Sequence, residues 1–178
     1  ISSKPVMDVD FFREISSDLV PLDISKVIAN SKDKKVGIVM TNANNGNPHY
    51  HEPTKETWID ALIASSSMPL VTKGAHRIGN DDFMDGAWSD SLPVKWAVEQ
   101  GATDILIIRT TAEKEKMQQS WLDYFGELYN WRQKDIKRIF QTNHIKFNQS
   151  LEFILNPPAG IRIQQIAPDK KLDRKSVV

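Results

Sequence analysis

The chain has 178 residues, with 23 basic and 23 acidic side chains, no cysteine and 40% hydrophobic residues. This length suits one domain with a sizeable core. The balanced charge argues against a dedicated nucleic-acid binder, which normally carries a basic excess, so we expect no nucleic-acid partner. Without cysteine there is no disulfide, thiol nucleophile or thiolate metal site. No run of 18 apolar residues occurs, which excludes a membrane-spanning helix within this sequence.

The chain begins at Ile1, without Met and without a charged and apolar leader. This start predicts a piece of a longer product or a processed form. The lack of cysteine and of a visible leader predicts a cytoplasmic location. Ten basic and four acidic side chains give residues 131–178 a net charge of +6. Such a basic end can bind an anionic membrane surface, but it is more often a solvated helix face.

In the first half of the chain, short apolar runs alternate with turn-forming residues. Residues 36–40 form a β-branched apolar run that predicts a buried strand. The turn formers at 42–48 then predict a hairpin whose second strand is 49–51. A helix is expected to open at residues 53–54 and to end at Ser65, and residues 73–82 indicate a hairpin or loop.

A helix followed by an apolar strand is predicted next. Pro93 fits the first turn of a helix over 94–100, which Gly101 closes. Residues 104–109 then form the clearest strand, because four consecutive apolar residues indicate burial on both faces, as in a parallel sheet covered by helices. The helix, short loop and strand are half of a βαβ unit.

After residue 112 the apolar pattern becomes helical. One stretch has its apolar face between Met117 and Tyr129, and a second has it between Ile136 and Ile154. Residues 161–166 alternate and predict a strand near a sheet edge. The predicted fold class is therefore α/β, part of a parallel sheet flanked by helices, with added C-terminal helices at residues 113–155.

Histidines and serines offer weak candidate sites. His49 and His51 lie two residues apart and could chelate a metal with His76, Glu52 or Asp81 as the third ligand, but no H-E-x-x-H helix or cysteine supports this. Two partly exposed hairpin histidines explain the pattern better, and we predict no metal. The serines at 65–67 lack a G-x-S-x-G elbow, so helix capping and close packing explain them better than a nucleophile.

Asp85 is the stronger candidate. Phe83 and Met84 favour burial, which predicts that Asp85 stands where a strand ends and the chain turns at Gly86. Asp before Gly commonly accepts backbone N–H bonds in such a turn. The functional alternative is a general base at the end of a sheet strand, where open α/β sheets place their sites.

Four segments in order resemble patatin-like phospholipases of the bacterial branch. The D-G-[GA] box of that family resembles Asp85-Gly86-Ala87, which is followed here by a Pro-containing stretch, a helix ending in Gly101-Ala102 and an apolar strand. The other resemblances are residues 61–69 to an "aLrASsa-P" segment, residues 39–43 with Gly46 to a "T-d-x-x-t-G" hairpin, and residues 7–12 to the start of this region.

The resemblance implies a Ser–Asp dyad in which Asp85 is the base and Gly86 and Ala87 complete the box. The family's nucleophilic serine sits in G-x-S-x-G, and a glycine-rich loop supplies the oxyanion hole. This chain contains neither motif, and both would lie upstream of Ile1. The resemblance therefore implies that residues 1–178 are the C-terminal portion of a single patatin-like domain, inactive alone. Such a piece should expose an apolar sheet edge and be held by the missing N-terminal segment or a second copy.

The implied function is part of a serine acylhydrolase that acts on an acyl ester, with phospholipid or lysophospholipid as the expected class. The reaction would pass through an acyl-serine intermediate, with no metal and no organic cofactor. The alternative is a non-catalytic domain of the same fold. It would bind a membrane surface or a protein through the basic end and the aromatic helix face at residues 121–129.

Overall fold

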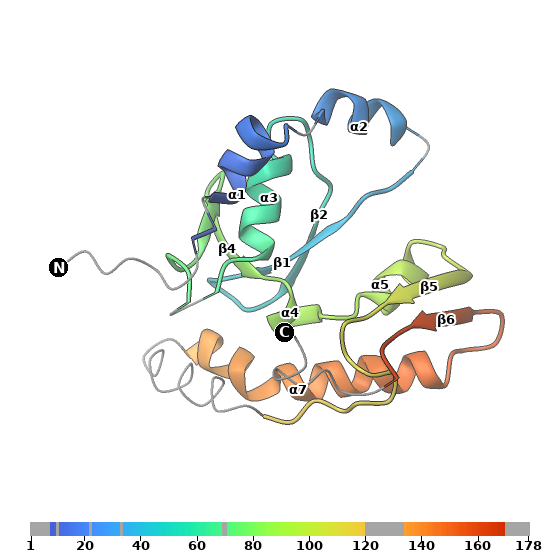
Figure 1. Ribbon diagram of the computed structural model, residues 1–178. Helices are drawn as coiled ribbons and strands as arrows, with labels where there is room; N and C mark the ends of the chain where they lie inside the picture. Colours follow the sequence, from blue (N-terminus) through green and yellow to red (C-terminus); the bar gives the residue numbers. More distant parts are fainter. Residues whose placement is uncertain are drawn as a thin grey trace. The chain divides into compact units, whose positions relative to one another are not determined.

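The computed structural model describes residues 8–9, 11–21, 23–32, 34–68, 71–119 and 134–169. The contacts divide the chain into two compact units, one formed by residues 1–91 and 120–143 and the other by residues 92–119 and 144–178. Each unit has its own sheet (Figure 1). Among the described helices, none combines the length and apolar character that crossing a bilayer requires.

The sheet of the first unit is antiparallel. Its strands are β1 (Ile38–Asn42), β2 (Pro48–His51), β3 (His76–Ile78) and β4 (Asp81–Asp85), in the order β2-β1-β4-β3. The β1–β2 hairpin is confirmed. Asn42 Oδ1 accepts the amides of Asn44 and Asn45 in its turn, and Gly46 takes a φ of 73°, which favours glycine.

Helix α3 (Trp58–Ser65) covers this sheet. Its two alanines, Ala61 and Ala64, form a buried cluster with Met40 of β1 and Phe83 of β4. Short side chains at these positions let the helix lie close to the strands. The N-terminal elements are α1 (Phe11–Glu14), the π-helix η1 (Ile15–Leu19) and α2 (Ile24–Asn30), and α4 (Ala87–Asp90) follows β4.

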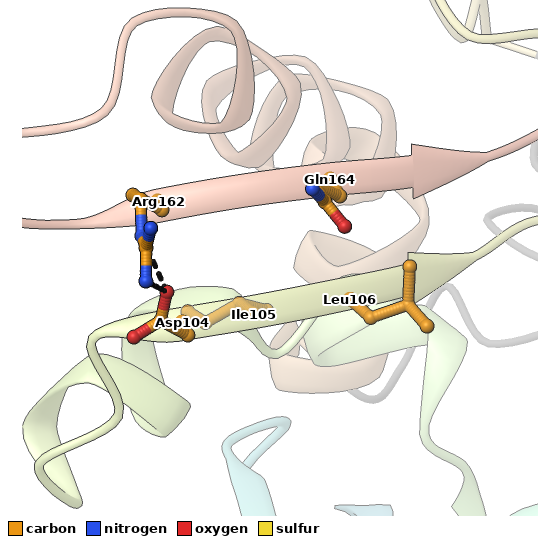
Figure 2. A pocket seen from close by; sticks show the side chains of 5 residues that line it. All are labelled: Asp104, Ile105, Leu106, Arg162 and Gln164. Atoms are coloured by element: carbon orange, nitrogen blue, oxygen red, sulfur yellow. Dashed lines mark hydrogen bonds and ion pairs between the residues drawn. The ribbon is translucent and has the colours of Figure 1, made fainter.

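The second unit contains α5 (Val94–Glu99), β5 (Asp104–Ile108) and β6 (Arg162–Ile166). The two strands pair in parallel (Figure 1), with Arg162 bound to Asp104 at their first residues (Figure 2). The chain returns from β5 to β6 through α7 (Lys134–Leu155), whose residues from 144 onward belong to this unit.

The α/β class is confirmed, with the parallel part in β5–β6. The four-stranded sheet is antiparallel throughout. Its outer pairs β1–β2 and β3–β4 are hairpins, which join only antiparallel strands, and the central strands β1 and β4 also pair antiparallel. The second amphipathic stretch is confirmed as α7, with its apolar face buried at Ile139, Phe140, Phe147, Leu151 and Ile154. The first stretch falls mostly on residues 120–133, outside the described residues, and its described start at 115–119 is not helical.

The prediction that β5 is buried on both faces is wrong for the described residues. Ile107 is 9% exposed, but its neighbours Leu106 and Ile108 are 59% and 76% exposed. The reason is that α5 and α7 pack on one face only. Their residues Val94 and Ile154 cluster with Ile107, and the partly buried members of this cluster are Leu92, Ile105, Phe153 and Ile163.

Candidate active site

Asp85 is the last residue of β4, as the sequence predicts. It pairs across the sheet with Met40, the fully buried centre of β1. The two residues before it, Phe83 and Met84, are buried, and α4 begins two residues later at Ala87. The apolar pair thus fixes the strand in the core and brings Asp85 to the point where the chain turns.

Three hydrogen bonds hold Asp85 in place. Its amide donates to the Ser67 carbonyl at 2.8 Å, and its own carbonyl accepts from Thr41 Oγ1 at 2.8 Å. Its side-chain Oδ1 accepts the amide of Ala87, also at 2.8 Å. The backbone is therefore anchored on both sides, and the carboxylate is oriented by the turn that follows it. The structure shows the predicted bond from a turn amide to the Asp85 side chain. This bond is compatible with Asp85 as a turn residue and with Asp85 as a general base.

Thr41 and Ser89 form a buried polar pair behind this turn. Their hydroxyl oxygens are 2.7 Å apart, and both side chains are almost fully buried. Because the Thr41 proton goes to the Asp85 carbonyl, Ser89 is the donor in the bond to Thr41. Sequence reasoning did not assign a role to either residue, although Thr41 lies within one of the segments that resemble the family.

Position 86 has no room for a side chain. Its φ of −63° suits any residue. A Cβ at this position, however, would lie 2.2 Å from the Val39 carbonyl oxygen and 2.6 Å from its carbon, both backbone atoms of the β1 strand. Real Cβ atoms do not approach so closely, so only glycine lets the turn after β4 pass against β1. Ala87, by contrast, is exposed.

Burial changes the acidity of Asp85. The side chain is half-buried, and this desolvation raises the pKa of its carboxyl group, opposed by the hydrogen bond from the Ala87 amide. No cation is among the causes that set this pKa. A carboxylate that is fixed in position and more basic than usual is the property required of a general base.

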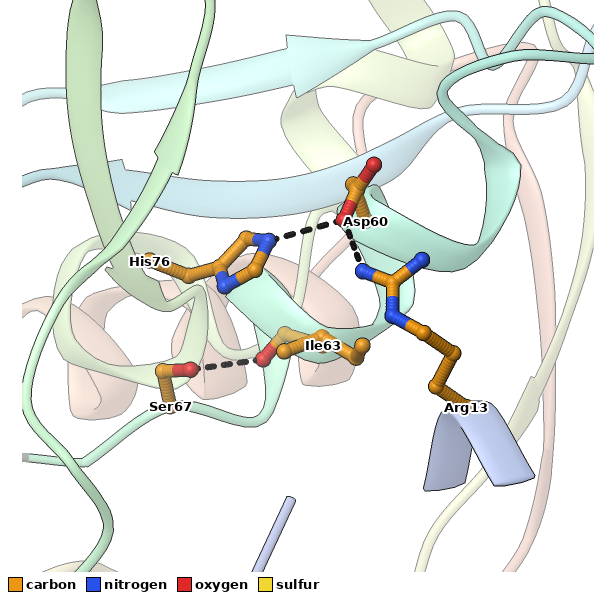
Figure 3. Close-up of polar contacts among 5 residues, drawn as sticks. All are labelled: Arg13, Asp60, Ile63, Ser67 and His76. Carbon is orange, nitrogen blue, oxygen red and sulfur yellow. Dashed lines mark hydrogen bonds and ion pairs between the residues drawn. The ribbon is translucent and has the colours of Figure 1, made fainter. Parts of the chain in front are cut away.

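Two of the three serines at 65–67 donate hydrogen bonds to backbone carbonyls. Ser65 Oγ donates to the Val39 carbonyl at 2.8 Å, and the buried Ser67 Oγ donates to the Ile63 carbonyl at 2.7 Å (Figure 3). Ser66 is exposed at the end of α3. Hydroxyls bound to carbonyls at a helix end fit the capping and packing roles that the sequence favoured.

His76 pairs with Asp60. Its Nε2 lies 2.9 Å from Asp60 Oδ1, the oxygen that also binds Arg13 of α1 (Figure 3). Burial favours the neutral form of Asp60, but the hydrogen bonds from Arg13 and His76 outweigh it and lower the pKa of this carboxyl group. The serine hydroxyl drawn in the same figure binds Ile63, so these side chains do not form a Ser–His–Asp relay here.

His49 and His51 lie side by side on β2, with ring centroids 5.9 Å apart. His51 Nε2 is bound to Thr57 Oγ1, while the His49 ring packs on Phe83. Burial and the neighbouring His49 lower the pKa of His51. Among the residues that the structure describes, no three histidine or acidic side chains come together as metal ligands would.

A comparison with protein-family models identifies the family of this chain. The family model of patatin-like phospholipases matches residues 9–98, about half of the chain, and the chain belongs to this family. The matched part contains β1 to β4, with Asp85, Gly86 and Ala87.

A curated relative is the uncharacterized protein YjjU of Escherichia coli (strain K12). It is 27% identical over 173 residues, which are 94% of this chain and 47% of the relative. The chain thus spans about half the length of the curated relative that it matches.

The close approach at Gly86 gives a stability prediction. Gly86→Ala should lower the free energy of unfolding by about 1–3 kcal/mol, because the added methyl group meets the Val39 backbone rather than a movable side chain. Urea unfolding followed by tryptophan fluorescence measures this. Ala87→Ser, at the exposed neighbouring position, should change stability by less than about 0.5 kcal/mol. Equal stability of Gly86→Ala and the wild type would contradict the steric account.

The raised pKa of Asp85 gives a second prediction with a definite sign. The folded state binds the Asp85 proton more tightly than the unfolded state, so the carboxyl group supports folding fully only below its unfolded pKa of about 3.9. That contribution is lost as the pH rises through the folded value. Asp85→Asn should therefore unfold at higher urea than the wild type near about pH 7, and the difference should shrink toward about pH 4. A variant that is less stable at neutral pH would contradict the assigned cost of burial.

Proposed function

We propose that this chain supplies the base of a Ser–Asp dyad in a patatin-like lipid acylhydrolase. The nucleophilic serine would lie in the part of the protein outside residues 1–178. The observation that carries the proposal is the Asp85 carboxyl group, held at the end of β4 with a raised pKa. Only one of its oxygens, Oδ1, is engaged by the Ala87 amide; Oδ2 accepts no hydrogen bond from any residue that the structure describes.

In the proposed mechanism Asp85 moves one proton at each step. The serine hydroxyl gives its proton to the Asp85 carboxylate while its oxygen attacks the ester carbonyl carbon. The tetrahedral intermediate collapses, the C–O bond to the alcohol breaks, and Asp85 returns the proton to the departing oxygen. A water molecule then gives a proton to Asp85, attacks the acyl-serine and releases the fatty acid as the serine recovers its proton. The mechanism uses no metal ion and no organic cofactor.

The surroundings of Asp85 support this role. A carboxylate with an ordinary pKa is a weak base at neutral pH, and partial burial brings its basicity closer to the working range. Gly86 and the Thr41–Ser89 pair act through the backbone of the turn and are positioning residues. The resemblance places the oxyanion donors in a glycine-rich loop that residues 1–178 do not contain, so these donors are proposed to lie in another part of the protein.

The proposed substrate class is an acyl ester of a phospholipid or lysophospholipid, reached by transient contact with a membrane surface. The exposed apolar residues of the N-terminal segment support such contact: Phe11, Phe12, Leu19 and Val20 are 41–71% exposed. They also favour the second candidate, a non-catalytic domain that binds membranes. The aromatic face at residues 121–129, which the sequence suggests for that role, lies outside the described residues.

Replacement of the base tests the proposal. In the complete gene product, Asp85→Asn should lower kcat/KM for a short-chain p-nitrophenyl ester by roughly 100- to 10,000-fold, since the amide cannot take up the serine proton. Size and the Ala87 hydrogen bond are kept, so the circular dichroism spectrum should not change. If activity is retained, Asp85 is only a turn residue. If the wild type hydrolyses neither this ester nor long-chain and phospholipid substrates, the binding-domain candidate replaces the enzyme.

Replacement of the histidine separates a dyad from a triad. His76→Ala in the complete protein should leave kcat within about threefold of the wild type, because in this structure His76 bonds to Asp60 and is not part of the proposed proton path. The same ester assay measures it, with His76→Gln as the control that can still hydrogen-bond. Loss of activity in a folded His76→Ala protein would replace the dyad with a histidine-based triad.

A further inference from the structure

Tyr50 of β2 donates a hydrogen bond to Asp90 of α4. Its phenol oxygen lies 2.6 Å from Asp90 Oδ2, and both side chains are partly buried. A hydrogen bond to an ionised carboxylate is shorter and stronger than one between neutral groups. This bond connects two segments whose residues are 40 positions apart in the sequence, so it can hold α4 against the β1–β2 hairpin.

Asp90 is the last residue of the helical turn that begins directly after Asp85. The amides of Ser89 and Asp90 donate to the Gly86 carbonyl at 3.1 and 2.9 Å, and these two bonds close the turn. The first amide of α4, that of Ala87, donates to Asp85 Oδ1 at 2.8 Å. A displacement of α4 would therefore move the Ala87 amide and change the orientation of the Asp85 carboxylate.

The α4 helix is too short to hold its own position. It has four residues, of which Ser89 is the buried one. Helical segments of this length are not stable alone in water, so contacts with the rest of the unit fix α4 in place. Ser89 bonds to Thr41 of β1, and Trp88 packs edge-on against Phe140 of α7, with ring centroids 4.5 Å apart. Tyr50 adds the polar attachment to β2.

The attachments to the β1–β2 hairpin lie on one face of the sheet. Tyr50 is paired across the two strands with Val39, whose carbonyl group is the close neighbour of Gly86. Thr41, two residues further along β1, is on the same face, because side chains alternate along a strand. The hairpin therefore holds the turn at its start, where Gly86 packs on β1, and at its end, where the Tyr50 hydroxyl binds Asp90.

We propose that Tyr50 is a positioning residue for the Asp85 base. Its hydroxyl holds Asp90, and thereby α4, at the place where the Ala87 amide meets the Asp85 carboxylate. Neither Tyr50 nor Asp90 takes part in the proton transfer itself. The inference rests on the proposed function, because the position of Asp85 affects catalysis only if Asp85 is the base.

Removal of this hydrogen bond in the complete gene product tests the inference. Tyr50→Phe and Asp90→Ala each delete the bond from one side, whereas Asp90→Asn keeps an oxygen that accepts it. Thr57→Val is the matched control, since it removes the hydroxyl that lies 2.9 Å from Nε2 of His51, the neighbour of Tyr50 on β2. Three quantities are measured: kcat and KM for a short-chain p-nitrophenyl ester, the pH dependence of kcat/KM, and hydrogen exchange at the Ala87 amide by mass spectrometry.

Tyr50→Phe should lower kcat roughly 10- to 100-fold with KM within about twofold, because the base is displaced while ester binding is kept. The acid limb of the kcat/KM profile should move to higher pH, since a weaker bond from the Ala87 amide lowers the pKa of Asp85 less. The Ala87 amide should exchange roughly 10-fold faster. Asp90→Asn should stay within about threefold of the wild-type kcat, because its oxygen still accepts the phenol proton.

Asp90→Ala should reproduce the changes of Tyr50→Phe, and Thr57→Val should match the wild type in all three measurements. If either kcat or the acid limb is unchanged in the two variants that delete the bond, the inference is overturned. Equal losses in Thr57→Val would also overturn it, because the effect would then be general destabilisation. An inactive wild type would overturn the proposed function and this inference together, whereas an active wild type with unaffected variants would overturn this inference alone.

Discussion

The site depends on one close approach, that of Gly86 to the backbone of Val39. Because no side chain intervenes, the turn after β4 lies directly against β1, and Thr41 of β1 can reach the Asp85 carbonyl. The same turn presents the Ala87 amide to the carboxylate. A larger residue at position 86 would separate the two strands at the point where Asp85 is oriented. The glycine of the Asp-Gly-Ala box is therefore explained by packing, and the proposed role of the aspartate rests on its partly buried carboxyl group.

The proposed role is supported by the cost of burying Asp85. A turn residue whose only task was to cap an amide would be more stable with its carboxylate in water. In this structure desolvation raises its pKa, and no cation is among the causes that offset the effect. Perturbed pKa values are frequent at functional sites, and this supports the proposed role of Asp85 as a base. The buried Thr41–Ser89 pair holds the same turn, because Thr41 donates to the Asp85 carbonyl and is itself hydrogen-bonded to Ser89.

Local features of the fold could be predicted from the sequence. The asparagine-rich turn before Gly46 predicted the first hairpin, the apolar period of α7 predicted its buried face, and Phe83 and Met84 placed Asp85 at a strand end. Features that depend on distant segments could not be predicted in this way. Thr41 and Ser89 meet only because β1 lies beside β4, and the antiparallel order of that sheet has no signature within any single strand. The steric role of Gly86 likewise requires knowing that Val39 is its neighbour.

The burial of β5 differs from what its sequence pattern predicts. Its apolar run predicted two buried faces, and the described residues cover one. The described helices α5 and α7 pack on the Ile107 side of the strand, so Leu106 and Ile108 remain exposed in the described part of the chain.

The central claim is that Asp85 activates a serine located outside these 178 residues. The most direct test is to treat the complete gene product, and its Asp85→Asn variant, with a fluorophosphonate, which reacts covalently with activated serines. The account predicts one labelled serine outside residues 1–178, and labelling roughly 100-fold slower in the variant. A labelled serine within these residues, or equal labelling of both proteins, would contradict it.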